Sequence, residues 1–403
     1  MAKQPKIRFK GFTEEWKEKK ISDLLLERID MAPQNDAYPL MAFVANKGIV
    51  SKGDRYDRSA LIKDAVNKPY KRTSYGDFIY SSNNLEAGSI GMNFYGNASI
   101  SPVYSIFAPK GDNNPYYLGV RLAMPDVIHE MVRCRQGVVY GQWKIHEDEF
   151  LNISVNMPKP DEQKAISQVI IDLTTTISQR EVELEKFKNI KRALLEKLFP
   201  KDGQTIPAIR FKGFDENWEP KILGNEIEET GTKNRNNLPL ESYSITNEAG
   251  FIPQNEKFEN GGYVADADKT MYTIVPPQSF AYNPARINVG SIGYYNGTKD
   301  VIVSSLYIVF KTSEAIHDDF LMAWFKSDIF NHLIYTLQEG GVRQYFFYDK
   351  MVQCPILLPK TPEQEKIAQL VNSLNKTISL REQQLTLLKH SKQALLEQMF
   401  VNE

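Results

Sequence analysis

Two long stretches of this chain repeat one another, and both carry the hydrophobic spacing of a long helix. From Ile166 onward, apolar residues recur at steps of four and three, as they do along the seam of a coiled coil. Adding 201 to each number gives a second series, and the polar interruptions Arg180 and Lys191 map onto Arg381 and Lys392. The predicted seam residues are Ile166, Ile170, Leu173, Ile177, Leu184, Phe187, Leu194 and Leu198, then Ile367, Val371, Leu374, Ile378, Leu385, Leu388, Leu395 and Met399.

Both predicted helices have clear N-terminal borders. Proline-containing segments, 157–160 and 358–362, precede them, and acidic residues follow in the first turn, where the helix dipole favours negative charge. About 38 residues at a rise of 1.5 Å make a rod of roughly 57 Å. Parallel packing would force residues 207–360 to bridge that length between their own ends, so we expect the two helices to pack antiparallel.

The repeat extends beyond the helices. Pro5–Trp16 returns as Pro207–Trp218, and Gly88-Ser-Ile-Gly91 returns as Gly290-Ser-Ile-Gly293. The chain is therefore one unit of globular domain plus helix, duplicated, and antiparallel helices would place one domain at each end about a pseudo-twofold axis. The predicted segments are a first domain at 1–160, a first helix at 161–200, a linker at 201–206, a second domain at 207–361 and a second helix at 362–403.

Each globular part is predicted to be mixed α and β, which gives an α+β fold class overall. Runs with a period of two at 103–107 and 301–310 predict strands, and 116–133 and 318–337 predict helices, the former disturbed by Pro125. Residues 31–75 and 231–275 align poorly although the sequence around them matches. Dissimilar inserts in a duplicated frame suggest one task performed on two different targets. The alternative is drift in unimportant loops.

Composition and charge limit the class of protein. Apolar residues make up 42% and charged residues 25% of the chain, as in ordinary soluble proteins, and no run of 18 apolar residues or signal-peptide core occurs. We therefore expect a cytoplasmic protein. Residues 1–160 carry 22 Lys and Arg against 18 Asp and Glu, or +4, whereas residues 207–360 carry 14 against 19, or −5. If both domains bind a polyanion, the second needs help from a partner.

Signatures of catalysis are missing from the sequence. There is no Asn/Asp-Pro-Pro-Tyr/Phe run for adenine methylation, no Gly-x-Gly-x-x-Gly and no Walker loop. Asp161 and Glu162 stand at a helix start, where capping is the expected role. The five histidines lack ligand spacing, and two cysteines that do not match in the repeat make neither a disulfide framework nor a metal cluster. We expect a non-catalytic chain without a metal site.

What remains is binding chemistry suited to a DNA duplex. Cations reach phosphates, and Arg, Asn and Gln can read base edges. The candidate DNA-binding residues are Lys52, Arg55, Arg58, Lys71, Arg72, Arg135, Gln136, Gln142 and Lys144 in the first domain, and Asn283, Arg286, Asn288, Asn296, Lys299, Arg343 and Gln344 in the second. A solvated charged face, or Gly-rich turns before a closing strand, would explain the same residues without DNA. Trp143 and Tyr282 are expected in the core.

The order of these motifs resembles the specificity subunit of type I restriction-modification systems. The resemblance rests on four elements, each present twice: the Pro-x-Ile-Arg-Phe-x-Gly-Phe opening, the Gly-Ser-Ile-Gly motif, the Glu-Gln pair after a proline at the helix start, and a closing Leu-Leu with a final Phe. In sequence these are Pro5–Trp16 and Pro207–Trp218, Gly88–Gly91 and Gly290–Gly293, Pro160–Gln163 and Pro362–Gln364, and Leu194–Phe199 and Leu395–Phe400. It covers essentially the whole chain.

The resemblance implies a function and a set of partners. Each globular domain would be a target-recognition domain reading one half of a split double-stranded DNA site, with the helices fixing the gap. Two methyltransferase subunits would supply adenine-N6 chemistry with S-adenosylmethionine, and motor-nuclease subunits would use ATP and Mg²⁺, so this chain itself would hold no cofactor. The competing hypothesis is a protein-protein scaffold that holds partners at a set distance without reading DNA.

Overall fold

The computed structural model describes residues 4–51, 68–138, 142–247, 250–257, 268–337 and 345–401. The chain divides into two compact units. Unit 1 comprises residues 1–179 and 385–403, and unit 2 comprises residues 180–384. Each unit therefore contains one globular domain together with part of both long helices.

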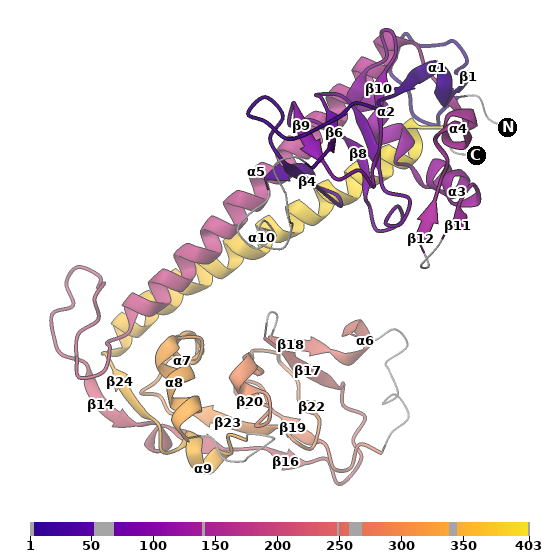
Figure 1. Cartoon of the computed structure of the whole chain (residues 1–403). Coiled ribbons are helices and arrows are strands. Elements are labelled where there is room, and N and C mark those ends of the chain that lie inside the picture. The colour runs from indigo at the N-terminus through magenta and orange to yellow at the C-terminus, as the bar shows by residue number, and fades with distance from the viewer. Residues whose placement is uncertain are drawn as a thin grey trace. The chain divides into compact units, whose positions relative to one another are not determined.

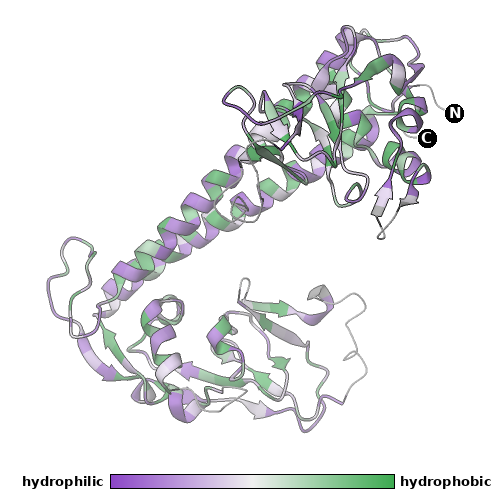
Figure 2. Ribbon diagram, in the orientation of Figure 1, coloured by the Kyte–Doolittle hydropathy of each residue, from purple (hydrophilic) through white to green (hydrophobic). Residues whose placement is uncertain are grey.

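The two long helices are continuous. Helix α5 spans Pro160–Leu198 and helix α10 spans Thr361–Met399, each with 39 residues, and Figure 1 shows both drawn without a break. None of the predicted seam residues is exposed: Ile166, Ile170, Ile177, Leu184, Leu198, Ile367, Val371, Leu385 and Met399 are buried, and Leu173, Phe187, Leu194, Leu374, Ile378, Leu388 and Leu395 are half-buried. Hydrophobic and hydrophilic residues alternate along both helices in Figure 2, as amphipathic helices require.

Within unit 2 the helices run in opposite directions. Arg381 donates to Glu183 at 2.7 Å, and Lys188 forms an ion pair with Glu382 at 2.7 Å. Farther along α5, Leu195 joins the hydrophobic cluster that contains Val371 of α10. From residues 183–188 to residue 195 of α5, the α10 partners fall from 381–382 to 371, which is antiparallel packing as predicted. In unit 1 the start of α5, at Ile166, shares a cluster with the end of α10, at Met399.

The globular part of unit 1 consists of short strands and helices. In chain order they are β1 Lys17–Lys20, α1 Ile21–Leu24, β2 Leu25–Glu27, β3 Met31–Ala32, β4 Met41–Val44, β5 Gly48–Ser51, β6 Tyr70–Thr73, β7 Phe78–Tyr80, β8 Ile90–Met92, β9 Ala98–Ile100, β10 Ser105–Pro109, α2 Pro115–Leu122, α3 Pro125–Arg133, β11 Gln136–Val138, β12 Gln142–Lys144, α4 Glu147–Asn152 and β13 Ser154–Met157.

The globular part of unit 2 is built in the same way. Its elements are β14 Glu219–Ile222, the 3₁₀ turn η4 Leu223–Asn225, β15 Ile227–Glu229, β16 Thr232–Lys233, β17 Tyr243–Thr246, β18 Gly250–Pro253, α6 Gln254–Lys257, β19 Thr273–Val275, β20 Ser279–Tyr282, the 3₁₀ turn η6 Ile287–Val289, β21 Ile292–Tyr295, β22 Val301–Val303, β23 Ile308–Thr312, α7 Asp318–Phe325, α8 Asp328–Leu337, α9 Tyr348–Met351 and β24 Pro355–Leu358.

The sheets of the two domains have matching topology. A four-stranded sheet has the order β2-β10-β7-β8 in unit 1 and β15-β23-β20-β21 in unit 2, and a three-stranded sheet has the order β3-β6-β9 or β16-β19-β22. The segments that align poorly, 31–75 and 231–275, carry the same hairpin, β4-β5 and β17-β18. Their described parts therefore share a scaffold, and the two halves differ in side chains more than in backbone elements.

The end of each long helix is packed into a domain core by aromatic contacts. In unit 1, Phe400 lies edge-on to Trp16 at 6.4 Å between ring centres and stacks on Tyr117 at 5.3 Å. In unit 2, Phe199 meets Trp218 at 6.2 Å. Both tryptophans come from the repeated Pro-x-Ile-Arg-Phe-x-Gly-Phe segment, so this motif seals a domain onto a helix end.

Three predicted elements are interrupted in the structure. The run 301–310 is two strands, β22 and β23, because residues 304–307 form a turn in which the amide of Tyr307 donates to the Ser304 carbonyl at 3.0 Å. The predicted helix 318–337 is α7 and α8, broken where the Ser327 hydroxyl donates to the Trp324 carbonyl at 2.7 Å. The helix at 116–133 likewise divides, into α2 and α3, before Pro125.

Candidate nucleic-acid interface

Arginines of the repeated opening motif anchor each domain to a helix start. Arg8 donates twice to the Glu162 carboxylate, at 2.6 and 2.8 Å, and Arg210 donates twice to Glu363, both at 2.8 Å. Glu162 and Glu363 are buried, and the hydrogen bond that Arg8 donates to Glu162 raises the pKa of Arg8. Glu162, for which capping was the expected role, thus forms a buried bidentate ion pair with a residue 154 positions away.

Buried glutamines next to these glutamates complete the anchor. The amide nitrogen of Asn114 donates to Gln163 at 2.9 Å, and that of His317 donates to Gln364 at 2.8 Å. The side chains of Gln163 and Gln364 in turn donate to the carbonyls of Pro158 and Pro359. The Glu-Gln pair at each helix start therefore fixes a domain on its helix, so these residues are structural.

Glycines of the Gly-Ser-Ile-Gly motif make room for an asparagine. Gly88 and Gly290 have left-handed backbones, with φ of +86° and +85°. A Cβ on Gly88 would lie 2.4 Å from the side-chain oxygen of Asn46, and one on Gly290 would lie 2.1 Å from that of Asn247. The motif thus packs the turn after β4 or β17 against the turn before β8 or β21.

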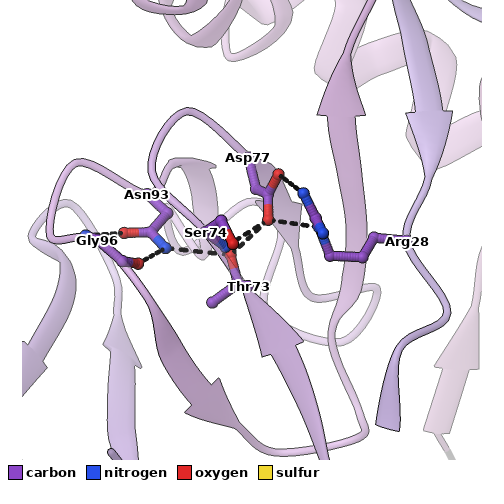
Figure 3. Close-up of polar contacts among 6 residues, drawn as sticks. All are labelled: Arg28, Thr73, Ser74, Asp77, Asn93 and Gly96. Atoms are coloured by element: carbon purple, nitrogen blue, oxygen red, sulfur yellow. Dashed lines mark hydrogen bonds and ion pairs between the residues drawn. The ribbon is translucent and has the colours of Figure 1, made fainter. Parts of the chain in front are cut away.

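A polar network specific to unit 1 holds two turns at one end of the domain (Figure 3). The Asp77 carboxylate accepts from Arg28 at 3.0 Å, from the Thr73 hydroxyl at 3.0 Å and from the Ser74 amide at 2.6 Å. The Asn93 side chain donates to Thr73 at 3.1 Å and to the Gly96 carbonyl at 2.7 Å. Asp77, Asn93 and Thr73 are buried, so both turns are rigidly held.

These turns present aromatic side chains to solvent. Tyr75 is 66% exposed, Phe94 43% and Tyr95 55%. Tyr75 and Phe94 meet edge-on at 5.7 Å between ring centres, and Phe94 stacks on Tyr116 at 5.3 Å. We call Tyr75, Phe94 and Tyr95 the aromatic tip of unit 1.

None of the three residues of the aromatic tip was among the candidate DNA-binding residues selected from the sequence. The repeat offset of 202 that relates β7 to β20 places Asn296 at the position of Phe94 and Gly297 at that of Tyr95. When the two halves are aligned, this turn carries aromatic residues in unit 1 and a polar residue and a glycine in unit 2. That difference is the sequence signal that could have identified the aromatic tip.

The described candidates of unit 1 are held by other residues of the domain. Lys71 donates to the Tyr104 carbonyl at 2.8 Å, and burial lowers its pKa. The Arg72 guanidinium lies 4.6 Å from the ring centre of Tyr38. Arg135 pairs with Glu86 at 2.7 Å, Gln136 donates to Glu149 at 3.1 Å, and Lys144 pairs with Glu147 at 3.3 Å.

The candidates of unit 2 are more available. Arg286 and Asn288 are exposed around η6, and Asn296 and Lys299 are exposed in the turn after β21. None of these four side chains forms a hydrogen bond or ion pair with another residue of the described ranges. Asn283 differs because its side-chain oxygen accepts from the Ala285 amide at 3.0 Å and so shapes the turn.

Several candidates fall outside the description. Lys52, Arg55, Arg58, Arg343 and Gln344 lie outside the described residues, as does the side chain of Gln142.

The prediction of a core role holds for Tyr282, which is fully buried. It is wrong for Trp143, whose side chain is 48% exposed. Trp143 lies in the short hairpin β11-β12, which forms a sheet of two strands within the described part of the chain.

No group of three or more His, Cys, Asp or Glu side chains in the described parts of the chain could hold a metal ion. None of the described helices is long and apolar enough to cross a membrane.

Comparison with solved structures identifies the fold. Over 99% of this chain and 100% of the other, the structure matches the S subunit of a type I restriction-modification system from M. genitalium, with a TM-score of 0.58 at 12% sequence identity. The chain has the fold of a type I restriction-modification S subunit. A second match, with a TM-score of 0.53 at 12% identity, covers 96% of this chain and 98% of a chain in a structure of a type I restriction-modification system described for its complex assembly and conformational transition. No protein-family model matches the sequence.

The S-subunit fold accounts for the duplicated arrangement described above. Mixed α/β domains joined to two long helices, predicted from the repeated motifs, are what the structure contains. At this identity the likeness concerns the fold, so the residues that would read DNA must be argued from this chain alone.

Proposed function

We propose that this chain is the DNA sequence-specificity subunit of a type I restriction-modification complex, and that it is not itself an enzyme. Each globular domain reads one half of a bipartite double-stranded DNA site, and the helices set the gap between the halves. The observation that carries this proposal is the S-subunit fold of the whole chain, in which one domain-plus-helix unit occurs twice, with matching sheets but different side chains at matched turns.

The two domains offer different chemistry to the two halves of the site. Unit 2 presents Arg286, Asn288 and Asn296, which can hydrogen-bond to base edges in the major groove. Unit 1 presents the aromatic tip at the matched position, suited to apolar contact with thymine methyl groups or to stacking. Unlike surfaces in one frame fit two unlike half-sites.

The helices are the proposed docking site for two methyltransferase subunits. On α5, Val182 is 69% exposed and Ile190 38% exposed, and they flank a shallow hollow of about 570 Å³. Glu185, Lys186, Asn189 and Ala193 complete its lining. An apolar strip with charged flanks on a helix suits a partner helix. In this proposal the partners carry S-adenosylmethionine, and restriction subunits carry ATP and Mg²⁺.

Binding with and without methyltransferase subunits tests the proposal. Methylation mapping of the host genome would first identify the site, and gel shifts would then compare the chain alone and in complex on that duplex and on a shuffled one. The charge of −5 over residues 207–360 predicts weak binding alone and tighter, site-dependent binding in the complex. Equal affinity for both duplexes would instead favour the protein-protein scaffold.

Shortening both helices tests separately whether they set the gap between the half-sites. Deleting residues 177–183 and 378–384 removes one heptad from each helix, which preserves the seam pattern. Seven residues at 1.5 Å shorten each helix by about 10.5 Å, close to three base pairs at roughly 3.4 Å each. We expect the complex to select sites with a gap about three base pairs shorter. An unchanged gap would show that helix length does not set the distance between the half-sites.

A further inference from the structure

Lys326 joins three parts of unit 2 through its ammonium group. It is the residue that follows α7, and its Nζ donates to the Gly290 carbonyl at 3.0 Å, to the Asn247 side-chain oxygen at 3.0 Å and to the Asn247 carbonyl at 3.3 Å. A lysine ammonium has three N–H groups, so all three are used. One side chain therefore clamps the turn after β17 and the turn before β21 onto the end of α7.

The clamped turn before β21 carries two of the candidate DNA-reading residues. Gly290 caps η6, Arg286 precedes it, and Asn288 lies within it. The backbone there is already compact, since the amides of Gly290 and Ser291 donate to the carbonyls of Ile287 and Arg286 at 2.8 and 3.1 Å. Because Lys326 holds the Gly290 carbonyl, the end of this turn is fixed relative to α7.

Unit 1 secures the corresponding contact in a different way. There the Asn46 amide donates directly to the Gly88 carbonyl at 3.1 Å. The residue that caps α2, in the place that Lys326 takes after α7, is Ala123. The lysine clamp thus belongs to unit 2 alone, which makes unit 1 an internal control.

We propose that Lys326 is a positioning residue for DNA reading by unit 2, holding the Arg286–Gly290 segment in the geometry that meets base edges. This inference rests on the proposed function. Among the described residues, the Lys326 ammonium group donates to Asn247 and Gly290, so it acts through the Arg286–Gly290 segment.

The surroundings of Lys326 make the clamp sensitive to pH. It lines a cleft of about 1,060 Å³ with charged groups from every neighbouring helix: Lys188, Lys191, Arg192 and Glu196 of α5, Asp319 of α7, Asp328 of α8 and Glu382 of α10. Burial, together with the smaller effect of the positive charge of Lys191, lowers the pKa of Lys326 to about 8. Above that pKa the neutral amine has two N–H groups for three acceptors, so one contact is lost.

The experiment uses the full chain and its methyltransferase complex with three variants, Lys326→Met, Lys326→Arg and Lys191→Met. Hydrogen exchange of the Gly290 and Ser291 amides in the DNA-free chain reports on the clamp alone. We expect several-fold faster exchange in Lys326→Met, and near wild-type exchange in Lys326→Arg, which keeps the donors. In wild type, the exchange rate of these amides, corrected for the intrinsic pH dependence of exchange, should increase from pH 7 to 9. Lys191→Met removes a positive charge that lowers the pKa of Lys326, so the increase should occur at higher pH in that variant.

Binding to duplexes mutated in one half-site at a time gives the functional readout. Lys326→Met should lose about tenfold in discrimination at the half-site of unit 2 and none at that of unit 1. Unchanged exchange in Lys326→Met overturns the clamp, and faster exchange with unchanged discrimination overturns the positioning role. If wild type itself discriminates at neither half-site while Lys326→Met still exchanges faster, the proposed function has failed and the clamp is structural only.

Discussion

The guanidinium of Arg381 on α10 lies 4.4 Å from the ring centre of Phe187 on α5, and the same guanidinium donates to Glu183 at 2.7 Å. Arg381 interrupts the hydrophobic seam in sequence. In the structure it remains half-buried by covering an aromatic ring and pairing with a carboxylate. A buried polar residue is stabilised only when the two helices align so that its partners are within reach. Such a residue therefore selects the register in which the helices pack.

A double-mutant cycle measures this contact. Arg381→Ala and Phe187→Leu should each destabilise the chain, and the double variant should lose less than their sum, with a coupling of about 0.5–1 kcal/mol. Denaturant unfolding of the four proteins gives the value. Arg192, exposed on the same stretch of α5, provides the control cycle with Phe187, for which we expect no coupling.

Breaking the buried anchor between Arg8 and Glu162 should be far more damaging than breaking an exposed pair. Glu162→Gln leaves the Arg8 guanidinium partly buried without its carboxylate, so we expect a loss of roughly 3–5 kcal/mol in unfolding free energy. Glu363→Gln should do the same in unit 2. Glu14 pairs with Lys159 at 2.6 Å but both side chains are more than 60% exposed, so Glu14→Gln should cause no measurable loss. Equal effects of Glu162→Gln and Glu14→Gln would contradict the anchor.

Lys191 should make stability depend on pH. Burial in the helix seam lowers its pKa, so between that value and about 10.5 the unfolded chain binds more protons than the folded one. Its contribution to stability therefore increases as pH rises through this window. Lys191→Leu should be more stable than wild type at pH 7, by about 1–2 kcal/mol, with the difference shrinking toward pH 10.

Lys376→Leu serves as the control for that measurement, because Lys376 is exposed on α10. Its difference from wild type should be flat over the same pH range. If the difference in unfolding free energy between Lys191→Leu and wild type grew with pH, its pH dependence would have the wrong sign. That result would reject burial of the charged Lys191 as the cause.

Phe94→Ala tests the aromatic tip of unit 1. Removing a ring that stacks or covers a thymine methyl group should weaken binding of the complex to the cognate duplex by about 1–3 kcal/mol. The loss should disappear when the half-site of unit 1 is scrambled. Tyr335, 76% exposed on α8 of unit 2, is the matched aromatic control. If Phe94→Ala weakened binding to methyltransferase subunits instead of DNA, the tip would be a protein contact.

Arg286→Ala tests the reading surface of unit 2. If Arg286 reads a base, the variant should lose about 1–3 kcal/mol and relax preference at one position of that half-site. Arg235, also exposed in unit 2, should show no base-specific effect. Competition binding against single-base variants of the site distinguishes the two, and a uniform loss across all bases would assign Arg286 to a phosphate.

Sequence periodicity predicted the long helices because their burial follows a simple repeat. Residues such as Ile166 and Val371 need only face a partner helix, and spacing alone specifies that. Shorter elements were less predictable, since the break between α7 and α8 depends on one hydroxyl, that of Ser327, bonding to Trp324. Local pattern does not encode such a choice.

The candidate site was predicted less well than the fold, because charge in sequence does not reveal a side chain's partner. Arg135 was selected for its chemistry, yet it is paired with Glu86, 49 residues away. Phe94 was not among the candidates, and its exposure follows from a turn held by the buried Asn93 beside it. Only tertiary structure distinguishes these cases.

The division into units has a consequence for how the protein forms on the ribosome. Unit 2 is one uninterrupted stretch, residues 180–384, whereas the core of unit 1 includes Leu395, Met399, Phe400 and Val401. Although its first 179 residues are synthesised earliest, unit 1 must wait for α10 to emerge before Trp16 can be covered, and the domain made second is the first able to complete its core. Until the end of α10 arrives, the apolar surface of unit 1 that packs against it stays open to solvent.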